Sequence, residues 1–119
     1  MELKYFTYEE FDSPDLPNSG FANMDREFLE MLDNARQDSG ISYQITSGFR
    51  TEEHNEKVGG VKDSSHRKGK AADISVQNSR ERWIITTSLI KAGFKRLGIA
   101  KTFIHVDNDH EKPDAIWTY

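Results

Sequence analysis

The chain has 119 residues, a length that predicts one domain around a single modest core. Its 16 basic and 20 acidic residues are interspersed and leave a net charge of −4, which argues against the basic stripe of a nucleic-acid-binding protein. The absence of cysteine excludes a disulfide framework, a thiolate metal site and a cysteine nucleophile.

The N-terminal segment, MELKYFTYEEF, lacks the apolar stretch of a secretory signal. No apolar run in the sequence approaches the 18 residues that are needed to span a bilayer. We therefore expect a protein that is made in the cytoplasm without a signal peptide and that has no membrane span. We also expect it to be a monomer.

The first third of the chain predicts an extension followed by a helix. Residues 1–22 form an N-terminal extension and loop packed on the domain, since residues 12–20 hold two of the three prolines and a glycine. Asn23 is the predicted N-cap of the helix, and Gly40 lies just beyond its end. Helical spacing places five apolar residues on one face: Met24, Phe28, Met31, Leu32 and Ala35.

The middle of the chain predicts a strand, a short helix and a second strand. Residues 41–49 alternate and are rich in β-branched and aromatic side chains, a pattern typical of a strand. Thr51 is a suitable cap for a short helix that runs to Val58. Residues 71–76, AADISV, form a short apolar run that predicts a central strand.

A further helix and a hairpin follow. Asn78 and Glu81 form a capping-box-like pair before a helix that stops at Gly93. Residues 94–99 and 102–108 predict two strands that form a hairpin.

The last five residues, 115–119, predict either a final strand or a packed tail. The order of elements is then helix, strand, helix, strand, helix, strand and strand. This order predicts a small α+β fold over residues 1–119, a single domain whose mostly antiparallel sheet has flanking helices.

One charged residue interrupts an apolar run. Asp73 lies inside the predicted central strand, and it needs a partner because an unpaired buried carboxylate costs several kcal/mol. His66 precedes it by seven residues, and Gly69 between them allows the chain to turn back. His105 lies in the apolar strand FIHVD, where alternation places Asp107 on the same face.

These side chains have the chemistry of a zinc site. Two imidazoles and one carboxylate are a common zinc ligand set, and catalytic zinc keeps a fourth position for a water whose pKa it lowers to roughly 7. The residues by themselves leave a second interpretation open. A strand histidine is more often a hydrogen-bonded core residue, and a buried aspartate more often accepts from loop N–H groups.

A set of motifs in a fixed order resembles the zinc D-Ala-D-Ala carboxypeptidases, which share a fold with the hedgehog signalling domain. The motifs are ITSGFR, HN, VGG, SSHRKGKAADI and FIHVD, and the resemblance covers about residues 20–119. It implies a Zn²⁺ cofactor held by His66, Asp73 and His105. It also implies that Arg50 points into the site and binds the substrate carbonyl or stabilises the oxyanion.

The sequence departs from the family pattern at the catalytic base. Many relatives carry a carboxylate three residues before the last zinc histidine, and Thr102 occupies that position here. Asp107 is the predicted substitute because it shares a strand face with His105, and Asp109 is second. Three loop carboxylates are further alternatives: Glu52, Glu53 and Asp63.

The resemblance implies a zinc metallopeptidase that hydrolyses a peptide bond in bacterial cell-wall stem peptides, as a D-Ala-D-Ala carboxypeptidase or an endopeptidase. The partner would be the peptidoglycan stem peptide. Small size and the missing signal resemble endolysin-like phage or prophage enzymes, which act at the cell wall once released or carried by a virion. The alternative is a catalytically silent, zinc-stabilised binding module of the same fold. A metal-free structural protein is a third interpretation.

Overall fold

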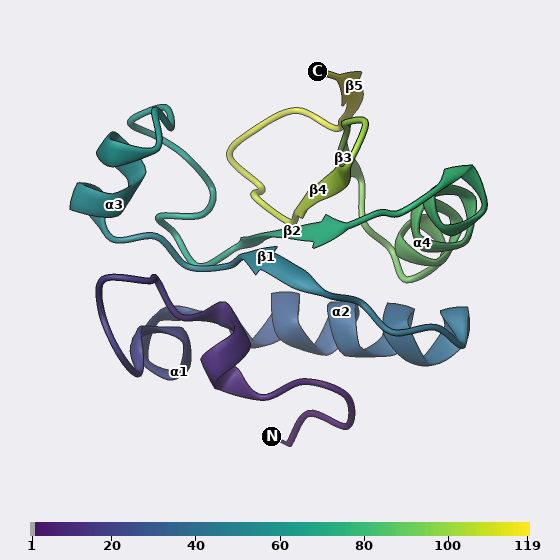
Figure 1. The fold of residues 1–119 in the computed structure, drawn as a ribbon, viewed down its shortest axis with the longest axis horizontal. Coiled ribbons are helices and arrows are strands. Elements are labelled where there is room, and N and C mark those ends of the chain that lie inside the picture. Colours follow the sequence, from purple (N-terminus) through teal and green to yellow (C-terminus); the bar gives the residue numbers. More distant parts are fainter. Residues whose placement is uncertain (1) are drawn as a thin grey trace.

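The computed structural model describes residues 2–119 and contains a five-stranded sheet with flanking helices (Figure 1). The strands are β1 (Ile45–Ser47), β2 (Ala71–Ser75), β3 (Arg96–Ile99), β4 (Phe103–Asp107) and β5 (Ala115–Thr118). The helices are the 3-10 helix η1 (Tyr8–Phe11), α1 (Ser19–Asn23), α2 (Arg26–Ser39), α3 (Glu52–Lys57) and α4 (Ser79–Lys91).

The strands lie in the order β1-β2-β4-β3-β5. In this described range β5 runs parallel to β3, and the other pairings are antiparallel. The α+β class and the mostly antiparallel sheet are therefore confirmed, as is the hairpin of β3 and β4. The C-terminal residues form a strand and not a packed tail.

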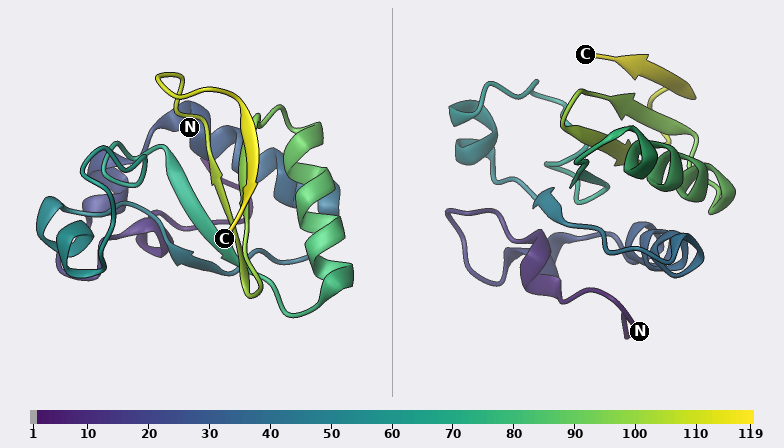
Figure 2. Two further views of the ribbon diagram at one scale, coloured as in Figure 1. Left: turned by 90° about the horizontal axis from the view of Figure 1, so that it is seen from above. Right: turned by 45° about the vertical axis from the view of Figure 1, so that its right-hand side comes forward.

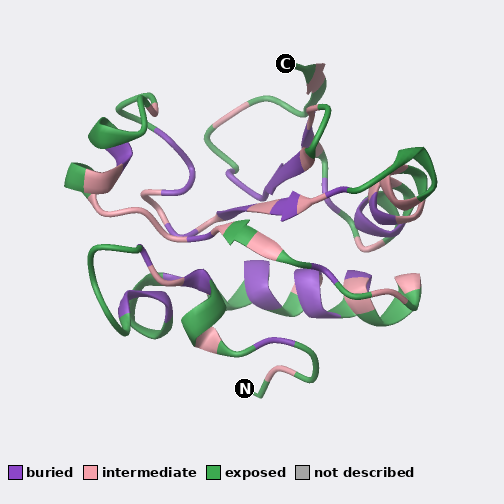
Figure 3. Cartoon of the chain, in the orientation of Figure 1, coloured by how far each residue is buried: buried purple, intermediate pink, exposed green. Residues whose placement is uncertain are grey.

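One face of the sheet carries the apolar core. Ile74, Ile104 and Val106 are fully buried and belong to the same cluster as the apolar residues of α2 and α4, which pack against each other (Figure 2). Figure 3 shows the buried stretches of these helices and strands at the centre of the molecule. Alternation along β4 then puts His105 and Asp107 on the opposite face of the sheet.

The predicted start of the first long helix was wrong. Asn23 ends a separate short helix, α1, which already begins inside the predicted loop. Extended backbone at Met24 separates the two helices, and the carboxylate of Asp25 caps α2 by accepting from the N–H of Phe28 at 3.0 Å. Gly40 ends α2 as predicted, with a φ of 73° that favours glycine.

The first strand is shorter than residues 41–49. Only the three residues of β1 pair with β2, because the chain that follows leaves the sheet for other partners. The N–H of Phe49 donates to the carbonyl of Phe11 at 2.8 Å, and the N–H of Arg50 donates to the carbonyl of His66 at 3.1 Å. These bonds place Arg50 beside the loop that carries His66.

Two predicted helix caps are confirmed. The hydroxyl of Thr51 accepts from the N–H of His54 at 3.1 Å, and the amide oxygen of Asn78 accepts from the N–H of Glu81 at 2.9 Å. The Glu81 carboxylate accepts in return from the N–H of Gln77. Among residues 2–119, none of the helices combines the length and the apolarity that a membrane crossing requires.

The N-terminal extension packs along the domain through apolar and polar contacts. Phe6 and Phe11 are buried in the core. The backbone N–H groups of Lys4 and Tyr5 each donate to the carboxylate of Asp33 in α2 at 3.0 Å. The extension thereby supports the segment after β1 that leads to Arg50.

Candidate active site

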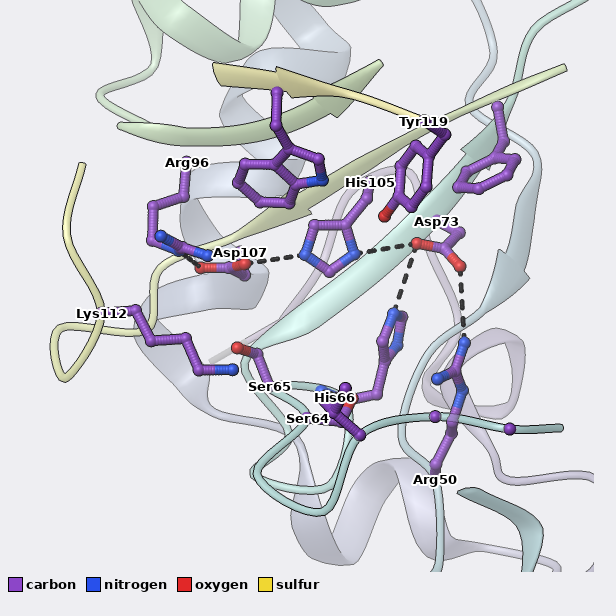
Figure 4. Close-up of a pocket in the computed structure, with 15 residues that line it drawn as sticks. Arg50, Ser64, Ser65, His66, Asp73, Arg96, His105, Asp107, Lys112 and Tyr119 are labelled. Carbon is purple, nitrogen blue, oxygen red and sulfur yellow. Dashed lines mark hydrogen bonds and ion pairs between the residues drawn. The ribbon is translucent and has the colours of Figure 1, made fainter. Parts of the chain in front are cut away.

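Three side chains from distant parts of the sequence meet on the open face of the sheet (Figure 4). His66 Nε2 lies 3.3 Å from Asp73 Oδ1, and His105 Nδ1 lies 3.1 Å from the same oxygen. The three candidate ligand atoms all lie within 4.8 Å of one another. Asp73 thus has the two histidine partners that its place in an apolar strand required.

Strand register and a tight turn bring these residues together. Asp73 and His105 are direct partners across the β2–β4 ladder, so their side chains project from the same face. His66 lies on the preceding loop, which turns at Gly69 with a φ of 71°. A side chain at Gly69 would also meet the carbonyl oxygen of Asn23 at 2.0 Å, so the turn requires glycine twice over.

Each imidazole is held so that one nitrogen faces Asp73. His66 Nδ1 lies 2.8 Å from the carbonyl oxygen of Gly48, an acceptor only, so Nδ1 carries a proton and Nε2 is turned toward Asp73. His105 Nε2 lies 2.7 Å from Asp107 Oδ2, which turns Nδ1 toward Asp73. Carbonyl and carboxylate partners of this kind orient histidine ligands in metal sites.

The donor set and its spacing fit zinc. Ligand bonds of about 2.0–2.2 Å in a tetrahedral arrangement place ligand atoms roughly 3.3–3.6 Å apart. The two distances to Asp73 Oδ1, 3.1 and 3.3 Å, are close to this range. The third pair, His66 Nε2 and His105 Nδ1, lies within 4.8 Å, so two imidazole nitrogens and a carboxylate oxygen could coordinate one ion if the two rings draw somewhat closer.

The electrostatics of the cluster also favour a cation. Burial raises the pKa of Asp73, but hydrogen bonds with His105 and His66 outweigh it and hold the pKa well below its usual range. Burial lowers the pKa of His105, but its bonds to Asp107 and Asp73 dominate and raise it. The cluster thus attracts positive charge. That charge can be a proton on His105, or a metal ion that competes with this proton.

Arg50 lies at the edge of this cluster. Its Nη2 is 3.6 Å from Asp73 Oδ2. Its Nε donates to Ser47 Oγ at 3.2 Å, and its Nη1 donates to Asn55 Oδ1 at 3.3 Å. Asn55 is itself buried and donates to the carbonyl of Val61, so the guanidinium is held on a fixed support.

The structure places Asp107 beside His105 but on the far side of the ring from Asp73 (Figure 4). Oδ2 of Asp107 contacts His105, and Oδ1 accepts from Arg96 Nε at 2.8 Å and from the N–H of Asp109 at 3.1 Å. Burial raises the pKa of Asp107, but the bond to His105 dominates and lowers it. Asp107 is therefore an anion that contacts His105 directly.

The other carboxylates considered as bases lie outside the cluster of His66, Asp73 and His105. Asp109 is buried and bonded to Ser65 Oγ at 2.7 Å and to Lys68 Nζ at 2.9 Å. Glu52, Glu53 and Asp63 are exposed on their helix and loop. His110 is exposed and pairs with Glu27 at 3.5 Å.

A pocket of about 350 Å³ opens over the cluster. The loop around Gly59–Val61 forms one wall, and aromatic side chains of Phe103, Trp117 and Tyr119 form another. Sequence reasoning missed this second wall and the role of Arg96. The alternation of aromatic residues in AIWTY was the available signal, because it places Trp117 and Tyr119 on one strand face.

The chain matches a known protein family. A family model described as Peptidase M15 matches residues 4–107. The chain belongs to the Peptidase M15 family. No curated protein matches the chain.

Membership in the Peptidase M15 family confirms the resemblance to the zinc D-Ala-D-Ala carboxypeptidases and supports a metallopeptidase. The matched range contains His66, Asp73 and His105, and it ends at Asp107. The aromatic strand β5 lies beyond the match.

Proposed function

We propose that this protein is a zinc-dependent peptidase that hydrolyses a peptide bond in bacterial cell-wall stem peptides. The bond is either the terminal D-Ala-D-Ala bond or an internal bond of the stem. The observation that carries the proposal is the convergence of His66 Nε2, Asp73 Oδ1 and His105 Nδ1 beneath one pocket. Membership in the Peptidase M15 family supports it.

His66, Asp73 and His105 would hold the zinc ion, since two imidazoles and a carboxylate suit it. Zinc, when bound, supplies a Lewis acid that polarises the substrate carbonyl and lowers the pKa of a water molecule to about 7. The Gly48 carbonyl and Asp107 hold the other nitrogen of each imidazole, which would leave His66 Nε2 and His105 Nδ1 to bind the ion.

Arg50 would bind the carbonyl oxygen of the scissile bond. Negative charge develops on that oxygen as the carbonyl carbon becomes tetrahedral, and a fixed guanidinium stabilises the charge without reorganising. The bonds of Arg50 to Ser47 and Asn55 supply this fixed position.

Hydrolysis adds the oxygen of water to the carbonyl carbon, moves a water proton to the leaving nitrogen and breaks the C–N bond. Asp107 stays the predicted carrier of that proton. Its contacts with His105 and Arg96 support a positioning role more directly, in which it holds the imidazole. The two roles predict different behaviour of the Asp107→Asn variant.

A zinc-stabilised binding module is the second candidate function. Two observations favour it. Thr102, which cannot act as a base, stands at the usual base position, and the Asp107 carboxylate is already bonded to His105 and Arg96. Such a module would bind the stem peptide without cleaving it. Either function would be exercised at the cell wall by a released or virion-borne protein, as in phage enzymes.

The deciding experiment incubates the zinc-loaded protein with a synthetic stem pentapeptide and with digested peptidoglycan, followed by mass spectrometry. Free D-Ala would identify a carboxypeptidase, and shortened internal fragments would identify an endopeptidase. A chelator should stop the reaction, and added zinc should restore it. Binding of the pentapeptide without any cleavage would reject the peptidase and favour the binding module.

A further inference from the structure

The aromatic side chains of Trp117 in β5 and of Tyr119, just after β5, reach across β3 to the site. Gly98 of β3 pairs with Trp117 on one side and with His105 on the other. The rings of Trp117 and His105 have centroids 5.5 Å apart, and those of Tyr119 and Phe103 have centroids 5.2 Å apart. The end of the chain therefore contacts residues of β4 that lie two strands away.

This approach depends on the missing side chain of Gly98. A Cβ atom there would lie 2.5 Å from Trp117 Nε1 and 2.9 Å from Tyr119 Cε2. Such distances are well inside van der Waals contact, so any larger residue would push both rings away from the site. The guanidinium of Arg96 packs on the Trp117 ring at 4.8 Å and helps to hold it.

The hydroxyl of Tyr119 points into the pocket toward His105 and Asp73, on the side opposite Arg50 (Figure 4). Its backbone N–H donates to the carbonyl of Ile99 at 3.2 Å, which fixes the residue at the pocket edge. The residue is exposed and lines the open pocket, so a bound peptide can reach it.

The cationic side chains that line the pocket are each held by protein partners, and only part of the Arg50 fork is left to meet a substrate oxygen. Arg50 donates to Ser47 and Asn55 and faces Asp73 with its remaining nitrogen. Arg96 donates to Asp107 and to the carbonyl of Pro113, and Lys112 Nζ donates to the carbonyl of Asp63. A phenol is a neutral donor that keeps its proton at neutral pH and costs little to present to a carbonyl oxygen.

We propose that Tyr119 is a further catalytic residue, whose hydroxyl donates a hydrogen bond to the carbonyl oxygen of the scissile peptide bond from the side opposite Arg50. This role rests on the proposed peptidase function. The bond shortens as the oxygen becomes negative, so it stabilises the transition state more than the bound substrate. No proton is transferred from Tyr119 in this step.

The test is the Tyr119→Phe variant, which removes the hydroxyl and keeps the ring against Phe103. With the stem pentapeptide, kcat should fall by about 10²-fold, the loss typical of an oxyanion donor, while KM changes little. Zinc content and Tm should equal those of the wild type. Tyr5→Phe is the matched control, since Tyr5 is also exposed but packs on Arg36 away from the pocket, and its kcat should not change.

A binding measurement separates this role from the proposed function. A phosphinate analogue of the D-Ala-D-Ala bond carries the tetrahedral oxyanion, and calorimetry should show weaker binding to Tyr119→Phe by about 10²-fold. If the wild type is active and Tyr119→Phe has an unchanged kcat, only the role of Tyr119 is overturned. Loss of zinc from the Tyr119→Phe variant would overturn that role as well. A wild type that cleaves nothing would overturn the proposed peptidase function. The Tyr119 proposal would then also be overturned if the phosphinate binds the wild type and Tyr119→Phe equally well, or binds neither.

Discussion

At the scale of single residues, the site depends on which atom of each side chain is turned inward. His66 and His105 use different nitrogens, Nε2 and Nδ1, because their other nitrogens meet Gly48 and Asp107. Sequence comparison and strand alternation indicated the residues but not these atoms. Two substitutions test the roles proposed for Arg50 and Asp107.

Arg50→Ala should retain zinc and lose turnover on stem peptides by about 10²–10³-fold, because one oxyanion donor is removed. Arg50→Lys should recover only part of the rate, since an ammonium lacks the planar fork that reaches both Ser47 and Asn55. Steady-state kinetics together with metal analysis check both variants. Wild-type rates in Arg50→Ala would show that Arg50 takes no part in the reaction.

Asp107→Asn keeps the shape of the side chain and removes its negative charge. Zinc affinity should fall by about 10–100-fold, because the partner of His105 Nε2 becomes a weaker acceptor. If Asp107 is also the general base, the rate at saturating zinc should fall by roughly 10²–10⁴. Kinetics over a series of zinc concentrations separate the two effects.

Full recovery of the Asp107→Asn rate at saturating zinc would contradict the general-base prediction and leave Asp107 as a positioning residue. Thr102→Ala is a suitable control. Thr102 occupies the usual base position of the family but is exposed just before β4. Its loss should therefore change neither the zinc affinity nor the rate at saturating zinc.

At the scale of elements, the buried carboxylate of Asp109 connects two segments that form the site. Asp109, on the segment after β4, accepts from Ser65 and Lys68 on the loop that carries His66. Burial raises the pKa of Asp109, but the bonds from Lys68 and Ser65 dominate and lower it to about 2. This contact joins the segment after β4 to the loop that carries His66.

The low pKa of Asp109 predicts a loss of stability in acid. A carboxylate whose folded pKa lies below its unfolded value, 3.8, stabilises the fold fully above pH 3.8 and loses this contribution as the pH falls toward 2. The contribution is on the order of 2 kcal/mol. Urea unfolding of the zinc-free protein between pH 5 and 2 measures it.

Asp109→Asn should be less stable than the wild type at pH 5 and should show a shallower decline between pH 4 and 2. Asp63→Asn is the matched control, because Asp63 is exposed and its carboxylate lies 3.9 Å from Lys112. Parallel curves for the wild type and Asp109→Asn would mean that Asp109 does not link pH to folding.

At the scale of the whole molecule, the candidate ligands join three separate segments: the loop after α3, strand β2 and strand β4. A metal ion held by all three would bind the folded chain and not the unfolded one. Its binding energy would therefore add to the stability of the fold.

Zinc should raise the Tm of the wild type, and His66→Ala should abolish both the rise and the bound metal. Ligand at 100 times its Kd contributes about 2.7 kcal/mol, which corresponds to roughly 10 °C for a domain of this size. Metal analysis and thermal unfolding with and without chelator provide the measurements. His110→Ala, an exposed histidine outside the cluster, is the control, and wild-type zinc content in His66→Ala would refute the ligand assignment.

Much of the fold followed from short-range patterns in the sequence. The caps at Thr51 and Asn78, the end of α2 at Gly40 and the two faces of β4 depend on residues only a few positions apart. Such signals are local, so they persist whatever the rest of the chain does. The misplaced start of α2 shows their limit, since Asn23 and Asp25 are both good caps, and Asn23 is already the last residue of α1.

The candidate ligands were predictable because a charge in an apolar strand must have a partner, and the family motifs indicated which partners. The position of Asp107 behind His105, the parallel pairing of β5 with β3 and the approach of Tyr119 over Gly98 were not predictable in this way. Each depends on contacts between segments that are distant in sequence, where sheet register and the space between packed side chains decide the outcome. The sequence by itself therefore determined most of the elements and the candidate metal ligands, and the tertiary structure decided the remaining element boundaries and the geometry around the ligands.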